Sequence, residues 1–234
     1  MLMKIMKSLV AAFLIIMLTG NTALAATESA VEKAGGTAAT ESAVEKAGGT
    51  AASDVLYVED TFEFVSPYGY RYFIATCVNN SEVNLDVSWD TVSYDASGSI
   101  LETGSSYSCY VAPGQSFVLY ALFLNSEDAK DYSYKIHYEE SSYIIPAFYD
   151  IDISASVSKN GKLILQAVNT SENEISSVQA ATLFFDENHK LVGFEDSYVV
   201  NSNYNVEAGE TVVKDIDIPE GADTYECYFT AYRW

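Results

Sequence analysis

Hydrophobic and polar residues alternate at period two along most of the chain after residue 55, and this alternation predicts β-strands. In residues 83–94 the apolar positions are Val83, Leu85, Val87 and Trp89. Short polar stretches rich in glycine, proline, asparagine and aspartate separate such segments about every eight to twelve residues. Asparagine followed by glycine at 160–161 is a strong signal for a tight hairpin. The pattern predicts an all-β protein of antiparallel strands.

One hairpin of this pattern occurs twice. Residues 92–100 and 183–191 each read as a strand that ends in an aromatic residue, an aspartate that begins a turn, and a second strand. Further landmarks recur in the same order at an offset of about 90 to 95 residues: Val78-Asn79-Asn80-Ser81 with Val168-Asn169-Thr170-Ser171, Tyr94-Asp95 with Phe185-Asp186, and Pro113-Gly114 with Ala208-Gly209. That offset is the length of one β-sandwich domain. We therefore expect two tandem sandwiches, at 54–142 and 143–234.

The recurring residues have structural explanations. Asn79 and Asn169 are expected to bond their own backbone in Asx turns, and Asp95 and Asp186 suit the first position of a turn. Glycine permits the φ values of a tight corner, which explains Gly114 and Gly209. We expect Tyr94 and Phe185 to pack rather than to form a site.

The set of landmarks resembles the FxLYD-type immunoglobulin-like domains of exported Gram-positive bacterial proteins. The resemblance covers most of both units and departs from the signature at Thr91, Ser93, Thr182 and Phe184, which stand where the signature has phenylalanine and leucine. It implies an immunoglobulin-like β-sandwich in a secreted or surface-associated protein. It implies no catalytic residues, because the family has no active-site motif to transfer.

The first 53 residues have a different composition. Lys4 and Lys7, the apolar run 9–18 and Ala23-Leu24-Ala25 predict a signal peptide over 1–25, and hence a secreted or cell-surface-associated protein. Asn21 stands where a lipoprotein signal has cysteine, so a lipid anchor at this site is excluded. Residues 26–38 recur identically at 39–51 and are small, polar and glycine-rich. We expect 26–53 to be a low-complexity linker, with at most a transient helical turn in each unit.

The charge of −21, from 33 acidic and 12 basic residues, argues against binding nucleic acid or an anionic membrane surface. No acid cluster has the spacing of a calcium loop, although calcium binding stays open. Four aspartates alternate with isoleucine, which is typical of the polar face of half-buried strands: Asp150, Asp152, Asp215 and Asp217. His137 and His189 match no zinc motif. We predict no catalytic residue, no metal and no cofactor.

The three cysteines form an odd set. Export permits disulfides, but pairing Cys77 with Cys109 would leave Cys227 alone. We expect three free, mostly buried thiols, with a bridge between Cys77 and Cys109 as the alternative.

The surplus of tyrosine, 18 residues, is the best indication of function. Tyrosine offers a rigid contact area with a hydroxyl, which suits protein or carbohydrate ligands, although β-sheets also use it at their surfaces. The candidate binding residues are Tyr68, Tyr70, Tyr72, Tyr107, Tyr110, Tyr132, Tyr134 and Tyr138.

The sequence thus predicts a non-catalytic extracellular binding module. The alternatives are a structural spacer in an envelope assembly and a hydrolase that uses dispersed carboxylates. A shallow aromatic patch would favour binding, and a deep cleft with converging carboxylates would favour the enzyme. Smooth charged surfaces would favour the spacer.

Overall fold

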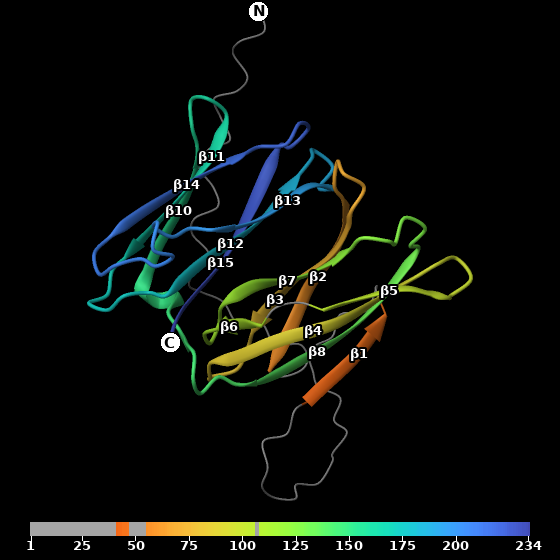
Figure 1. The fold of residues 1–234 in the computed structure, drawn as a ribbon, viewed down its shortest axis with the longest axis horizontal. Helices are drawn as coiled ribbons and strands as arrows, with labels where there is room; N and C mark the ends of the chain where they lie inside the picture. Colours follow the sequence, from red (N-terminus) through yellow and green to blue (C-terminus); the bar gives the residue numbers. More distant parts are fainter. Residues whose placement is uncertain (1–40, 47–54, 106–107) are drawn as a thin grey trace, which may run out of the picture. The chain divides into compact units, whose positions relative to one another are not determined.

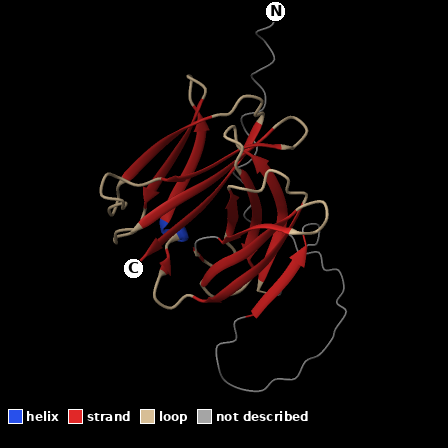
Figure 2. Ribbon diagram, turned by 45° about the vertical axis from the view of Figure 1, so that its right-hand side comes forward, coloured by secondary structure: helices blue, strands red, loops and turns tan. Residues whose placement is uncertain are grey.

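The fold is all-β, as predicted (Figures 1 and 2). A computed structural model describes residues 41–46, 55–105 and 108–234, the first of these segments by its backbone alone. The predicted signal peptide lies outside the described residues. The strands up to residue 140 are β1 (Glu41–Lys46), β2 (Leu56–Val65), β3 (Arg71–Asn79), β4 (Leu85–Tyr94), β5 (Ile100–Ser105), β6 (Cys109–Val111), β7 (Ser116–Phe123) and β8 (Asp131–Glu140).

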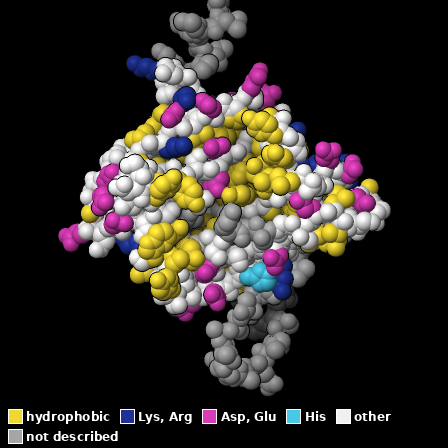
Figure 3. All heavy atoms as spheres, in the orientation of Figure 1, with side chains coloured by type: hydrophobic (Ala, Val, Ile, Leu, Met, Phe, Trp, Pro, Cys, Tyr) yellow, Lys and Arg dark blue, Asp and Glu magenta, His cyan; other side chains and the backbone are white. Residues whose placement is uncertain are grey.

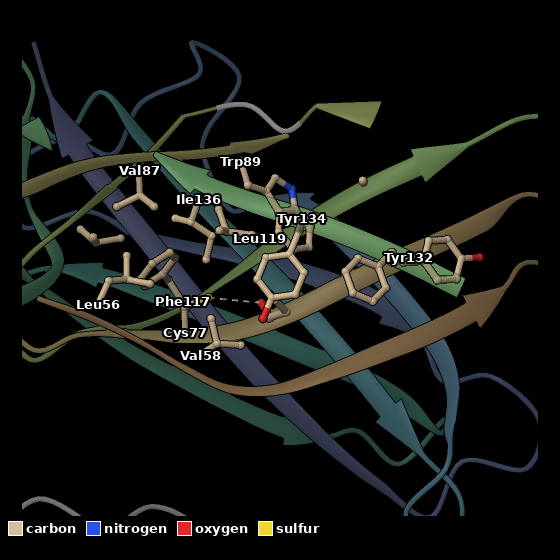
Figure 4. Packing of buried hydrophobic residues seen from close by; sticks show 14 of the residues in the cluster. Leu56, Val58, Cys77, Val87, Trp89, Phe117, Leu119, Tyr132, Tyr134 and Ile136 are labelled. Atoms are coloured by element: carbon tan, nitrogen blue, oxygen red, sulfur yellow. Dashed lines mark hydrogen bonds between the residues drawn. The ribbon is translucent and has the colours of Figure 1, made fainter. Parts of the chain in front are cut away.

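The first sandwich consists of two antiparallel sheets. One has the order β1-β8-β4-β5, with β6 also paired to β4, and the other has the order β2-β3-β7. Apolar side chains at alternate positions fill the space between them, among them Trp89 and Phe73, whose rings stack with centroids 5.5 Å apart. Figure 4 shows this core, with Tyr134 beside Trp89. The alternation read from the sequence thus selects the faces that form the core.

The second sandwich repeats this arrangement. Its elements are β9 (Ile145–Pro146), the 3-10 helix η1 (Phe148–Asp150), β10 (Ile151–Val157), β11 (Lys162–Asn169), β12 (Ser177–Phe185), β13 (Leu191–Tyr198), β14 (Thr211–Asp217) and β15 (Thr224–Arg233). They form the sheets β10-β11-β14 and β13-β12-β15-β9 around a second core. The two cores lie on either side of the predicted boundary between residues 142 and 143.

The two buried asparagines make matching hydrogen bonds. The Nδ2 group of Asn79 donates to the carbonyl oxygens of Val83 and Val111, and that of Asn169 donates to the carbonyl oxygens of Asn173 and Val206. The Oδ1 atom of each asparagine accepts from the backbone N–H two residues later, at 3.0 Å. The predicted Asx turns are confirmed. The Nδ2 groups of the same asparagines connect the end of β3 or β11 to the part of the chain just before β7 or β14.

The repeated hairpin is also built as predicted. The Oδ1 atom of Asp95 accepts from the backbone N–H groups of Ser97 and Ser99, and the Oδ1 atom of Asp186 accepts from those of Asn188 and Lys190. Phe185 is buried as expected. Tyr94 is only half-buried, because it lies on the face of β4 that points away from the core, where its hydroxyl bonds that of Ser133.

Strand β1 lies within the stretch expected to be a linker. Its six residues pair antiparallel with Tyr138 through Ser133 of β8. An uncovered edge strand leaves backbone N–H and C=O groups unpaired, and an extended segment of any composition can pair with them. The transient helical turn expected from Ser42 and Glu45 is not what these residues form.

The outer faces of two sheets pack against each other and join the sandwiches. Ile74 and Val118 of the β2-β3-β7 sheet form one cluster with Leu183, Phe185 and Leu191 of the second sandwich. The repeat relates β2, β3 and β7 to β10, β11 and β14, so the contact joins two non-equivalent sheets. Strand β7 is apolar on both faces, which is typical of a central strand. It is instead at the edge of its sheet, and the second sandwich covers part of its outer face.

The three cysteines are unpaired, as predicted. Cys77 is fully buried in the first core and Cys109 packs against the same core. Burial raises the pKa of the Cys109 thiol to about 12 and that of Cys227 to about 11.

Candidate functional site

A tight turn between β2 and β3 projects two tyrosines from the first sandwich. The backbone N–H of Gly69 donates to the carbonyl of Ser66, and Gly69 has a φ of +85°, which glycine adopts without strain. Tyr68 is 86% exposed and Tyr70 is 43% exposed, and their ring centroids lie 6.5 Å apart. The turn therefore presents two rings to solvent on a short, hydrogen-bonded support.

Apolar residues of the adjoining sheet extend this surface. Tyr72 of β3 lies opposite Phe64 of β2 and Leu122 of β7. Leu122 is 39% exposed, and Leu124, two residues further along the same face, is 54% exposed. We call Tyr68, Tyr70, Tyr72, Leu122 and Leu124 the Tyr70 surface.

The Tyr70 surface continues the contact between the sandwiches. The ring of Tyr72 lies 5.5 Å from that of Phe194 in the second sandwich. Figure 3 shows hydrophobic side chains gathered in the upper half, right of centre, where Figure 1 draws the turn after β2 and the neighbouring strand β13. Burial and then the nearby Glu195 raise the pKa of the Tyr72 phenol. This hydroxyl therefore stays protonated and can donate a hydrogen bond at neutral pH.

A second aromatic surface spans both sandwiches. The Tyr110 ring, on β6, lies 5.2 Å from that of Tyr232 on β15, and the Tyr232 ring lies 5.5 Å from that of Trp234. Pro146 of β9 is the cross-strand neighbour of Tyr232. We call these four residues the Tyr232 strip. Figure 3 shows hydrophobic side chains at the lower left, beside the point where Figure 1 marks the C end.

Two carboxylates flank the Tyr232 strip on the sheet of the first sandwich. Asp86 of β4 lies directly opposite Tyr110 on one side and Glu139 of β8 on the other. Burial, and then the charge of Glu139, raise the pKa of Asp86, while a hydrogen bond with Ser108 lowers it. Burial and the same Asp86 raise the pKa of the Tyr110 phenol. The flank is therefore a site of negative potential beside exposed rings.

The eight tyrosines predicted to bind a ligand lie in different parts of the structure. Tyr68, Tyr70 and Tyr72 come together in the Tyr70 surface, and Tyr110 lies in the Tyr232 strip. Tyr132 and Tyr134 are buried in the first core at 0% and 2% exposure, so their interpretation as surface contacts is wrong. Their alternation with polar residues marks a core face of β8 instead. Tyr138 is half-buried against the same core, and Tyr107 lies outside the described residues.

Several surface residues were not predicted. Leu122 and Leu124 lie in the stretch 116–124, which is apolar on both faces, and this pattern does not reveal that the second sandwich covers only part of one face. Tyr232 and Trp234 lie at alternate positions of the last strand. That spacing places two rings on one face and could have indicated the strip.

A polar cluster lies inside the contact between the sandwiches. The Tyr120 hydroxyl donates to the Asp196 carboxylate at 2.6 Å, and the Gln179 amide donates to both carboxylate oxygens at 2.8 Å. Beside them is a cavity of about 50 Å³, which Cys109 and Tyr228 also line. Such a volume holds one or a few water molecules and not a sugar ring.

The four aspartates that alternate with isoleucine have cationic partners or lie on an exposed strand face. Asp215 and Asp217 receive the Lys162 ammonium at 2.7 and 3.2 Å, which confirms the predicted polar strand face, and Asp152 is exposed on the same sheet. Asp150 instead pairs with Arg233. Within the described ranges, no three His, Cys, Asp or Glu side chains converge as metal ligands would. Nor does any helix there have the length and apolarity to cross a membrane.

Comparisons with known proteins add little. No family model and no curated protein matches the chain. Similar solved structures include crystal structures of a GH2 beta-galacturonidase from Eisenbergiella tayi. One, bound to galacturonate, has 9% identity and a TM-score of 0.18 over 70% of this chain and 34% of that chain. Another, bound to glycerol, has 10% identity and a TM-score of 0.17 over 70% and 33%. The chain spans about a third of these enzymes, and the TM-scores support no inference.

Proposed function

We propose that the chain is a non-catalytic extracellular binding module whose ligand contacts the Tyr70 surface. The observation that carries this proposal is the exposed group of Tyr68, Tyr70, Leu122 and Leu124 on a hydrogen-bonded turn and a rigid sheet. Exposed apolar groups of this kind, rimmed by polar residues, are typical of interaction sites. Export by the predicted signal peptide and the resemblance to immunoglobulin-like domains are consistent with this proposal.

The ligand class follows from the chemistry of the surface. Sugars stack on flat aromatic faces, whereas the Tyr70 surface combines two leucines with three tyrosines. Mixed aromatic and aliphatic side chains with few charges are typical of the centre of a protein–protein interface. The surface also continues the apolar contact that already joins the two sandwiches. We therefore propose a protein ligand.

The carboxylates favour binding over the hydrolase alternative. Asp196, in the cavity between the sandwiches, already accepts hydrogen bonds from Tyr120 and Gln179. The cavity beside it is far smaller than a typical substrate pocket of at least about 300 Å³.

A capture experiment tests the proposal. The chain without residues 1–25 is immobilised and exposed to the native surroundings of the protein, in parallel with a Tyr68→Ser/Leu124→Ser variant and a control, Val213→Ser, at a β14 side chain that is 58% exposed. The proposal expects one protein to be retained by the wild type and the control and lost by the double variant. Equal retention by all three would contradict it. Binding of glycans instead would identify a carbohydrate module, and no specific ligand would favour the spacer.

A further inference from the structure

The Tyr232 strip is an accessible surface separate from the Tyr70 surface. Trp234 is 73% exposed, and Tyr232 and Tyr110 are half-buried against each other. The strip draws one ring from the first sandwich and two from the second. Any ligand on it would contact both sandwiches at once.

The charges directly beside the strip are negative. Asp86 and Glu139 are directly opposed on neighbouring strands, an arrangement that destabilises a sheet. Lys135 and His137 lie on the same face of β8 as Glu139, but Lys135 is the cross-strand neighbour of Asp90 and the His137 Nε2 atom lies 2.9 Å from the Asp90 Oδ2 atom. Arg233, next to Tyr232 in the chain, binds Asp150, Ser171 and the Glu174 carbonyl on the opposite side of β15. Its guanidinium is thus not free to neutralise Asp86 and Glu139.

Exposed rings beside carboxylates favour one kind of ligand group. A guanidinium or ammonium is attracted to the face of Tyr and Trp, and carboxylates at the rim strengthen that attraction. The protein's overall charge of −21 steers the same class of ligand toward it. We propose that the Tyr232 strip, with Asp86 and Glu139, binds an arginine- or lysine-rich segment of a partner protein. This second site does not depend on the Tyr70 surface.

The two tryptophans make the site measurable. Trp89 is buried in the first core at 1% exposure, so a surface ligand changes the fluorescence of Trp234. The chain without residues 1–25 is titrated with a hexa-arginine peptide, and with hexa-glutamate and a glycine-serine hexamer as controls. We expect saturable quenching of the Trp234 fluorescence by hexa-arginine and not by the two control peptides. Salt should weaken the binding, and the Trp234→Phe variant should show no quenching.

Two charge variants distinguish a specific site for hexa-arginine from general attraction to the negative charge of the protein. Asp86→Asn/Glu139→Gln and Asp215→Asn/Asp217→Asn each remove two negative charges, the second pair on the far sheet of the second sandwich. We expect the first to weaken hexa-arginine binding about tenfold and the second by less than about twofold. Equal weakening by both, or none by the first, would overturn the proposal. Near-ultraviolet circular dichroism checks that both variants fold, and Tyr68→Ser should bind like the wild type.

Discussion

The Tyr120 hydroxyl of the first sandwich donates a hydrogen bond to the Asp196 carboxylate of the second, with 2.6 Å between the two oxygens. The bond lies in the contact between the sandwiches, where the Tyr120 ring packs against that of Phe194 with centroids 5.0 Å apart. It is charge-assisted, and such bonds stabilise proteins more than neutral ones do. Its partners come from strands β7 and β13, which are 76 residues apart in the chain.

Removing this hydroxyl should therefore destabilise the contact. We expect Tyr120→Phe to lower the free energy of unfolding in urea by about 1.5 kcal/mol, as for a hydrogen bond to a charged group. Tyr143→Phe, at a side chain that is 83% exposed, serves as control and should have no effect. A double-mutant cycle with Asp196→Ala should give a coupling energy of about 1 kcal/mol, and a coupling near zero would show that the bond is not significant.

Phe185 is the largest fully buried side chain of the apolar contact and packs edge-on against Phe62 at 5.4 Å. Truncation to alanine leaves a cavity and should lower the free energy of unfolding by about 3–5 kcal/mol. Because the residue faces the other sandwich, we expect the two cores to unfold in separate steps in the variant. Calorimetry would reveal them as two transitions. A single transition at a lower temperature would show that residues other than Phe185 couple the unfolding of the two cores.

Asn79 and Asn169 make equivalent hydrogen bonds, so equivalent substitutions should cost similar amounts. Either change to alanine leaves buried backbone groups without their hydrogen-bond partner. We therefore expect the free energy of unfolding in urea to fall by about 2–3 kcal/mol. Asn80→Ala, at the exposed neighbouring position, is the matched control. A large effect at only one of the two sites would contradict the structural repeat.

Stability should fall at alkaline pH. The thiols of Cys109 and Cys227 have folded pKa values of about 12 and 11, against an ordinary value of 9.0. Above pH 9 the unfolded chain loses protons that the folded chain keeps. The contribution of both thiols is therefore complete below pH 9 and is lost as the pH rises toward 12. Urea midpoints at pH 8 to 11 should decrease, and less steeply in Cys109→Ala/Cys227→Ala.

Asp95 should matter for stability and not for binding. Hydrogen bonds from Ser97 and Ser99 lower its pKa, so its contribution is present above pH 4 and is lost as the pH falls through the folded value. We expect Asp95→Ala to lower the melting temperature at pH 7 while capture of the ligand by the Tyr70 surface is unchanged. Loss of binding at an unchanged melting temperature would make the hairpin a site.

The sequence predicted what depends on local pattern. Period-two alternation located the strands, and the recurrence of Asn79 at Asn169 predicted the Asx turns that the structure contains. Tyr132 and Tyr134 were misassigned because alternation shows that one face of a strand is distinct but not what lies against it. The contact between the sandwiches was not predicted for the same reason. Leu122 and Leu183 each precede a phenylalanine near the end of an apolar strand, and only the tertiary structure exposes one and buries the other.

The contact between the sandwiches also bears on whether further sandwiches can associate with this pair. It joins two non-equivalent sheets of the repeat, so it is heterologous and, unlike a twofold contact, does not close on itself. A further sandwich could add in the same way to either outermost sheet. Those two faces carry Asp152, Asp215 and Asp217 at one end and Asp86, Asp90 and Glu139 at the other. Repulsion between these acidic faces disfavours the addition of further copies of the same sandwich.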